Sequence, residues 1–406
     1  MANTTLQNNQ NQHTTSVMPI FLAFLCMGFG DVAGPMVSMV KETFNLSNLM
    51  AQSVSFAGFV MFGLLSVPMG LLQDKKGKKY ILSLGLLVAL LGLLVPIVVG
   101  LYGSKVTIDA SSQWKFYPLL LAILFLGAGN TILQVAGNPI MRDVSAPGKY
   151  ASNLSLGQTI KAIGSSMGFL IPPFVAIPLG LDWTMLFPIF SAMLLISLLW
   201  VKTTPIYEKK EADAKVASLS SCLKLMGNGW VALMVFGIFA YVGAEVSMSS
   251  GVPTLLKEKY GFDQFGLFIS WLLFFLPILI GRFSGSLLLR FLSAKSFLIV
   301  TVLTSLVGIL ALLSGILSLT FVGIVLVGLG FANIFPLIFA ITVDSMPDRT
   351  NELSGLMVTA IVGGAILPLF SGWFADITGS AIALFFVPLA CLIYLSVVGV
   401  VALRKK

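Results

Sequence analysis

Histidine and cysteine are scarce in this chain of 406 residues. The only histidine, His13, lies in a polar N-terminal stretch, and the three cysteines, Cys26, Cys222 and Cys391, show no paired spacing. A disulfide framework and a metal site are therefore not expected. The sequence also lacks a phosphate-binding glycine loop and a serine with a histidine to activate it. These absences argue against an enzyme and against any bound cofactor.

Charge is scarce as well, because only 10% of the residues are charged while 57% are hydrophobic and the mean hydropathy is +0.99. This composition lies outside the range of soluble globular proteins. Apolar runs of about 20 residues are long enough to cross a lipid bilayer as helices. The net charge of +8 would suit a nucleic-acid partner, but the basic residues lie beside apolar runs and not on an exposed stripe. We therefore expect an all-α protein that contacts the bilayer and binds no nucleic acid.

Twelve apolar spans are predicted, and they divide into two sets of six. A polar stretch at 202–228 separates the sets, so 17–201 and 229–403 are predicted to be two six-helix bundles joined by a cytoplasmic linker. The ends, 1–16 and 404–406, are predicted to be cytoplasmic tails, the first of them disordered. The spans are 17–40, 49–72, 80–101, 117–140, 151–176, 183–201, 229–255, 264–289, 295–315, 319–343, 353–375 and 381–403.

The loops between these spans carry an uneven share of positive charge. Eighteen of the 24 basic residues fall on one side of the map and five on the other, with Lys161 left inside a span. Cytoplasmic loops of membrane proteins are enriched in lysine and arginine. The bias predicts a multi-pass protein of the bacterial inner membrane with both termini in the cytoplasm, and a monomer is expected.

The stretch Gly70–Lys79 is a short cationic link between the second and third spans. Its glycines allow a tight turn, and Asp74 is placed to pair with a lysine or to face a helix N-terminus. The stretch resembles the loop between helices two and three of the major facilitator superfamily, and a degenerate copy begins at Gly281. The resemblance implies a conformational-switch loop in each half. The residues assigned to it are Gly70, Asp74, Lys75, Gly77, Lys78, Gly281 and Arg282.

The two halves of the chain share further features at matching positions. Asp31 in the first span corresponds to Glu245 in the seventh, and Gly127-Ala-Gly129 in the fourth corresponds to Gly328-Leu-Gly330 in the tenth. Such internal repeats are typical of transporters in which two related bundles enclose a central binding site. The sequence therefore predicts the major facilitator fold, with twelve transmembrane helices in two pseudo-symmetric bundles.

Three charged residues, Asp31, Glu245 and Lys161, are predicted to lie deep inside spans, where charge is costly and usually functional. A carboxylate in a partly dry site can gain and lose a proton near neutral pH, so Asp31 and Glu245 are candidates for proton coupling. Lys161 is predicted to pair with one of them or to bind an anionic substrate. For all three, a purely structural ion pair is the alternative.

Polar side chains gather on the fourth and fifth spans. Asn130, Gln134 and Asn138 recur at four-residue spacing and share one helix face, and Gln158 lies near Lys161. Amides match sugar hydroxyls, although they also form hydrogen bonds between membrane helices. In the second half, Trp271 with Phe275, and Asn333 with Phe335, are candidates for substrate contact, in which the aromatic rings would form a wall against a sugar ring. Simple lipid contact of the aromatic residues is the alternative.

Several longer motifs resemble the fucose–galactose–glucose:proton symporter family of bacteria. They are Gly127–Pro139, Asn153–Gln158, Tyr241–Ser247, Asn333–Pro336 and Ile361–Pro368. The resemblance covers nearly the whole chain and implies proton symport of a hexose or deoxyhexose. It assigns Asp31 as the proton carrier, and Asn138 and Gln158 to the sugar site. The chain departs from fucose-carrying members at Gln134, where they have a glutamate, and in the additional Lys161.

A proton-coupled importer of a monosaccharide is the first hypothesis from the sequence. The extra positive charge at Lys161 makes a carrier of an acidic sugar or another small organic anion the main alternative. Drug efflux is a weaker one, and a sensor that no longer transports, or a membrane enzyme, is remote. The sequence leaves open which sugar is carried and whether protons or sodium ions drive the process.

Overall fold

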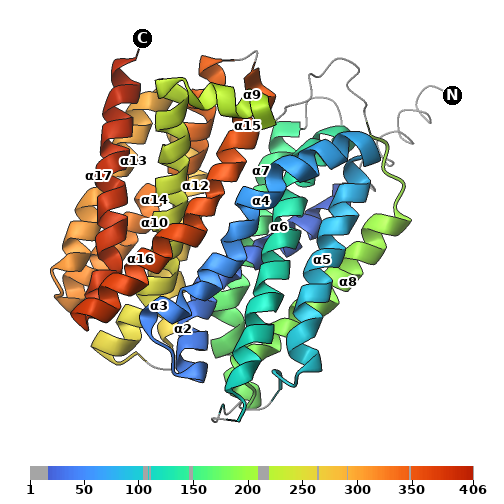
Figure 1. Cartoon of the computed structure of the whole chain (residues 1–406). Coiled ribbons are helices and arrows are strands. Elements are labelled where there is room, and N and C mark those ends of the chain that lie inside the picture. Colours follow the sequence, from blue (N-terminus) through green and yellow to red (C-terminus); the bar gives the residue numbers. More distant parts are fainter. Residues whose placement is uncertain are drawn as a thin grey trace.

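The computed structural model describes residues 17–103, 108, 111–145, 150–208, 219–262, 265–289, 291–346 and 349–405. The predicted tail at 1–16 and part of the predicted linker, 209–218, lie outside the described residues. The described chain is almost entirely helical, as the sequence predicts (Figure 1).

The first half contains six membrane-length helices, several of them made of consecutive helical segments. The first runs from residue 17 through η1 (Gly28–Val32) and α2 (Ala33–Phe44). The others are α3 (Asn48–Ala51) with α4 (Ser53–Lys76), α5 (Lys78–Val98), η2 (Gln113–Lys115) with α6 (Phe116–Val144), α7 (Tyr150–Ile171) with η3 (Pro172–Ala176) and η4 (Ile177–Leu179), and η5 (Trp183–Met185) with α8 (Leu186–Thr203).

The second half repeats this order after a short connecting helix, α9 (Leu219–Met226). Its six membrane-length helices are α10 (Gly229–Tyr260), α11 (Gly266–Ser270) with η6 (Trp271–Phe275) and α12 (Leu276–Leu288), α13 (Ala294–Leu313), α14 (Leu317–Ser345), α15 (Thr350–Thr359) with η8 (Ala360–Val362) and α16 (Gly363–Thr378), and η9 (Ala381–Phe385) with α17 (Phe386–Arg404).

Eleven of these helices are long and apolar enough to cross a membrane. The twelfth, α7, has 22 residues, and polar side chains such as Gln158 and Lys161 lower its hydropathy. In Figure 1 the helices up to α8 form one group and those from α10 onward form a second group beside it. The observed helices therefore match the predicted count and order. We call the end that holds Gly77 and Thr204 the linker end, and the end that holds Asn45 and Gly261 the distal end.

The predicted switch loop is much shorter than the sequence suggested. Gly70, Asp74 and Lys75 lie inside α4, and only Gly77 interrupts the helix, with a φ of +92° that favours glycine. The side chain of Asp74 lies outside the described part of the structure. The predicted second copy is not a loop: Gly281 and Arg282 both lie within α12, because the apolar run continues past them and the helix is not interrupted.

Glu208 of the linker caps the helix that follows Gly77. Its carboxylate accepts the backbone N–H groups of Lys78 at 2.6 Å and of Lys79 at 2.8 Å. The first N–H groups of a helix have no partner inside the helix, and a negative carboxylate at this end also interacts favourably with the helix dipole. The linker is therefore attached to the N-terminal bundle at this point.

Glu208→Ala is expected to destabilise the N-terminal bundle by about 0.5–2 kcal/mol, the usual cost of losing a helix cap. A lower midpoint of thermal unfolding of the purified protein would show this. Tyr207→Ala, at the exposed neighbouring position, serves as the control and is expected to leave the midpoint unchanged. Equal midpoints for the two variants would contradict the assignment of the cap.

Candidate functional site

Asp31 lies in η1, at the point where the first helix tightens, and faces the fifth helix. Its Oδ2 lies 3.3 Å from the Nζ of Lys161 and accepts a hydrogen bond of 2.8 Å from the hydroxyl of Ser165. Lys161 and Ser165 are four residues apart on α7, so both side chains emerge from one helix face. Of the partners that the sequence left open for Lys161, the structure selects Asp31.

Glycine on both helices makes this close pairing possible. A Cβ on Gly28 would lie 2.2 Å from the carbonyl oxygen of Lys161, and one on Gly164 would lie 2.1 Å from the carbonyl oxygen of Leu25. Distances this short mean that the two backbones pack directly against each other. The first and fifth helices are therefore held at a separation that only glycine allows, and this separation brings Asp31 to Lys161.

A second ion pair lies in the other bundle. The Oε1 of Glu245 on α10 lies 3.7 Å from a guanidinium nitrogen of Arg282 on α12. Arg282 also donates from Nε to the carbonyl oxygen of Ala332 at 3.4 Å. The sequence placed Arg282 at a cytoplasmic loop. The structure corrects this placement, since Arg282 lies within α12. Its charge is balanced by Glu245 inside the bundle, so the side chain does not have to reach water at the membrane surface.

The two pairs act on each other across the boundary between the bundles. Asp31 and Lys161 lie near enough to Glu245 for their charges to interact with it, and Asp31 likewise interacts with Arg282. The side chains remain partly accessible, with exposed fractions of 27% for Asp31, 17% for Lys161, 23% for Glu245 and 42% for Arg282. Four charges, two from each bundle, thus form one electrostatic cluster. Each acid of the cluster faces a cation from its own bundle.

The amide ladder predicted on the fourth helix is only partly visible. Asn130 is buried, and neither polar atom of its side chain has a hydrogen-bond partner among the described residues. A Cβ on Gly30 would overlap this amide at 2.0 Å, so Asn130 packs directly beside the segment that carries Asp31. Gln134 is half-buried one turn further, and the side chain of Asn138 lies outside the described part of the structure.

The remaining predicted substrate contacts occupy different surroundings. Gln158 is exposed on α7, one turn before Lys161. Trp271 is half-buried and stacks on Phe268, with ring centroids 6.1 Å apart, and its indole N–H has no partner among the described residues. Asn333 is buried and donates to the carbonyl oxygen of Gly281 at 2.8 Å, so its amide nitrogen already serves contact between α14 and α12.

Two ion pairs, one in the cluster and one at the linker end, were not recognised in the sequence. Arg282 was assigned to a loop and not identified as the partner of Glu245, although it falls within the predicted eighth span, 264–289, which was a usable signal. Lys78 pairs with Asp143 at 2.7 Å, which joins the start of α5 to the end of α6 at the linker end.

Within the described residues, no group of three or more His, Cys, Asp or Glu side chains could hold a metal ion.

Comparison with known proteins identifies the family. The model of the Major Facilitator Superfamily matches residues 20–360, which is most of the chain. The chain belongs to this superfamily. It is a multi-pass membrane transporter and not an enzyme, and the fold predicted from the sequence is confirmed.

Curated relatives match along nearly their whole length. A glucose/galactose transporter of Brucella abortus is 26% identical over 416 residues, covering 98% of this chain and 96% of the relative. The L-fucose-proton symporter of Escherichia coli is 21% identical over 411 residues, covering 91% and 88%. The resemblance to fucose, galactose and glucose symporters that the sequence motifs indicated is consistent with both names.

Solved structures support the fold. The transporter FucP in its outward conformation superposes with a TM-score of 0.68 at 18% identity, over 97% of this chain and all of that one. A bacterial homologue of the lysosomal transporter Spinster, in an inward-facing conformation, gives a TM-score of 0.71 at 15% identity, over 96% of each chain. At these identities the likeness concerns the architecture alone.

Proposed function

We propose that this protein imports a monosaccharide together with a proton across the bacterial inner membrane, with both termini in the cytoplasm. The observation that carries the proposal is the pair of Asp31 and Lys161 at the boundary between the bundles. Asp31 is partly accessible, so a proton could reach it, and its ionised form is the one that pairs with Lys161. Protonation of Asp31 removes its charge and leaves Lys161 without its counter-ion.

This change gives a route from proton binding to movement. A ligand shifts a conformational equilibrium only if it binds the two conformations with different affinity. A proton on Asp31 alters the electrostatic cluster shared by both bundles, including Glu245 and Arg282. The bundles would then rock about the site and expose it alternately at the two ends, as in related transporters with internal repeats.

The substrate class rests on the relatives and on the polar side chains beside the pair. The relatives are named for glucose, galactose and L-fucose, all of which are neutral hexoses or deoxyhexoses. Gln134 and Gln158 are candidates for contact with sugar hydroxyls, because an amide both donates and accepts hydrogen bonds. Asn130, Asn138, Trp271 and Asn333 stay candidates from the sequence, and Glu245 stays a candidate for a second proton site.

Proteoliposomes containing the purified protein provide the direct test. Labelled glucose, galactose and L-fucose are offered under an imposed proton gradient, an imposed sodium gradient, or neither. Accumulation of one of the three that requires the proton gradient is the expected result. Accumulation that follows sodium alone, or no accumulation of any of these sugars, would contradict the proposal.

An acidic sugar is the second candidate substrate, and one observation favours it. Each bundle contributes a cation to the cluster, Lys161 from the first and Arg282 from the second. With their acids protonated, these two groups could bind one carboxylate between the bundles. The uptake assay with glucuronate or galacturonate in place of the neutral sugar decides between the two substrate classes.

Lys161→Gln is expected to reduce proton-driven uptake of a neutral sugar strongly, because it leaves the Asp31 carboxylate without its cation. Removing one partner of a buried ion pair usually costs about 3–5 kcal/mol, and partial exposure lowers that figure here. The measurement is the initial rate of uptake under a proton gradient, with Lys259→Gln at the distal end as the control. Selective loss of acid uptake, with neutral sugar uptake unchanged, would instead favour the second candidate.

A further inference from the structure

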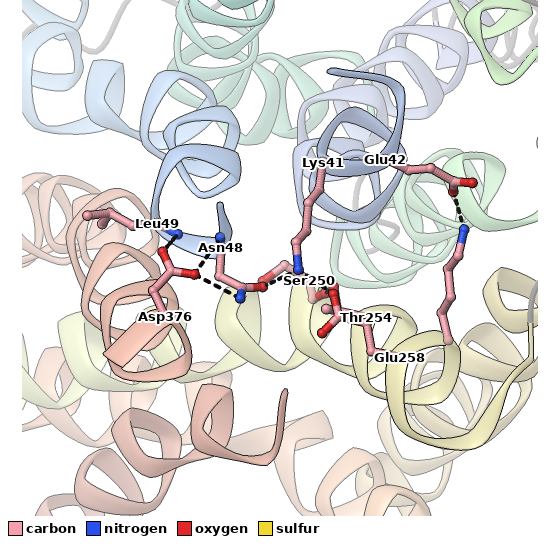
Figure 2. Close-up of polar contacts among 9 residues, drawn as sticks. Lys41, Glu42, Asn48, Leu49, Ser250, Thr254, Glu258 and Asp376 are labelled. Atoms are coloured by element: carbon pink, nitrogen blue, oxygen red, sulfur yellow. Dashed lines mark hydrogen bonds and ion pairs between the residues drawn. The ribbon is translucent and has the colours of Figure 1, made fainter. Parts of the chain in front are cut away.

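The first and seventh helices end in the same dipeptide. Lys41 and Glu42 lie in the last turn of α2, and Lys257 and Glu258 lie in the last turns of α10. At the distal end each lysine pairs with the glutamate of the other helix: Lys41 with Glu258, and Lys257 with Glu42 (Figure 2). Both ion pairs therefore join the N-terminal bundle to the C-terminal bundle.

The pairs belong to a longer network of polar contacts. Lys41 also donates to the side-chain oxygen of Asn48 at 2.7 Å, and the amide nitrogen of Asn48 donates to Asp376 on α16 at 2.9 Å. The carboxylate of Asp376 accepts the backbone N–H groups of Asn48 and Leu49, each at 2.8 Å. Figure 2 shows the contacts running from Glu258 through Lys41 and Asn48 to Asp376. Three of the contacts to Asp376 cross between the bundles.

Close packing lies directly beneath this network. The side-chain amide of Gln52 donates to the hydroxyl of Ser250 at 3.1 Å, and both residues are buried. A Cβ on Gly34 would lie 2.4 Å from the hydroxyl oxygen of Ser249, and one on Gly372 would lie 2.7 Å from the carbonyl oxygen of Asn48. At Gly34 and Gly372 the two bundles thus meet without space for a side chain.

Two ion pairs at the linker end each lie within one bundle: Lys78 with Asp143 in the first, and Arg349 with Glu352 in the second. The pairs of Lys41 with Glu258 and of Lys257 with Glu42 instead cross the boundary between the bundles at the distal end. Rocking of the bundles that opens the distal end must break them, whereas opening of the linker end does not.

We infer that Lys41, Glu42, Asn48, Lys257, Glu258 and Asp376 form a distal latch that keeps the distal end closed and sets the balance between the two conformations. The latch acts on the movement of the bundles, so it does not depend on which substrate is carried. Because the Lys-Glu dipeptide occurs at the end of both α2 and α10, the latch contains two equivalent ion pairs, Lys41 with Glu258 and Lys257 with Glu42. Each exposed pair is worth at most about fivefold in an equilibrium constant, so the effect comes from the set and not from one bond.

Exchange of the two residues of one dipeptide tests this without altering the net charge. The double variant K41E/E42K places a glutamate opposite Glu258 and a lysine opposite Lys257, so two attractions become two repulsions of similar size. Adding K257E/E258K restores both attractions with the signs reversed. The latch therefore predicts that the double variant opens the distal end and that the fourfold variant closes it again.

The readout is the distance between two spin labels at the distal end, measured by pulsed electron paramagnetic resonance in nanodiscs. The labels are attached at Y117C and I316C, exposed positions at the distal ends of α6 and α14, after replacement of the three native cysteines. We expect the long-distance population to rise about tenfold in the double variant, since two pairs are lost and two repulsions are added. In the fourfold variant the long-distance population should return to the value measured for the protein with the original Lys41, Glu42, Lys257 and Glu258.

Lys257 and Lys259 provide the matched control, because they lie two residues apart on α10. The Nζ of Lys259 lies 5.5 Å from the ring of its neighbour Tyr260, within the same bundle. K257Q should increase the long-distance population, and K259Q should not. Unchanged distances in K41E/E42K, failure of the fourfold variant to restore them, or equal effects of K257Q and K259Q would overturn the inference. None of these outcomes bears on the identity of the sugar or on proton coupling.

Discussion

Asp31→Asn is expected to abolish the accumulation of sugar driven by a proton gradient, while exchange of labelled for unlabelled sugar continues. Asparagine has nearly the same shape as aspartate and can still accept the hydrogen bond from Ser165, but it cannot take up a proton. A gradient of one pH unit supplies about 1.4 kcal/mol per proton, enough for about tenfold accumulation. The variant should show no accumulation above equilibrium in proteoliposomes.

Glu352→Gln is the control for this measurement, since Glu352 pairs with Arg349 at the linker end and lies apart from the cluster of four charges. It should accumulate sugar as the unmodified protein does. If Asp31→Asn still accumulated sugar in response to pH, the proton would have to bind elsewhere. Glu245 would then be the next residue to replace, because it is the acid of the second pair.

Gly164→Val is expected to be the most damaging substitution of a residue that bears no charge. A side chain at this position would overlap the backbone of Leu25, with its Cβ 2.1 Å from the carbonyl oxygen and 3.2 Å from the Cα of Gly28. Backbone atoms cannot move aside as a flexible side chain can, so the first and fifth helices must separate. Overpacking of this kind usually costs about 1–3 kcal/mol and more where the backbone must move.

Separation of these helices should also lengthen the contact between Asp31 and Lys161, so proton-driven uptake is lost along with stability. The midpoint of thermal unfolding and the rate of uptake, measured on the same preparation, test both effects. Gly229→Ala is the matched control, because a Cβ there meets no atom within 4 Å. A Gly164→Val protein with unchanged stability and uptake would show that the helices are not held together in this way.

The helices themselves were predictable because apolar runs of membrane length leave little choice of structure. Every backbone polar group must be satisfied inside the bilayer, so each run forms a helix. The polar α7 was recognised among the spans in spite of Gln158 and Lys161, since the apolar residues around them still reach membrane length. The superfamily was also recognisable, because its short motifs lie in the turns and helix contacts that the fold requires.

The pairing of charges was less predictable. The sequence gives the depth of Arg282 and Glu245 along their helices, but it does not give the rotation of one helix against another. For Lys161 both acids were open as partners, and only the close approach of Gly28 and Gly164 selects Asp31. The exchange of partners between Lys41 and Lys257 needs the relative position of two whole bundles, which no local pattern contains.

The two ion pairs have an electrical consequence. Asp31 with Lys161, and Glu245 with Arg282, together sum to zero when both acids are ionised. The empty site would then return to its outward-exposed state without moving net charge. The form that carries a proton on Asp31 and a neutral sugar has one extra positive charge. Each turnover would bring that charge inward, so the membrane potential would drive uptake by about 2.3 kcal/mol per 100 mV in addition to the difference in pH.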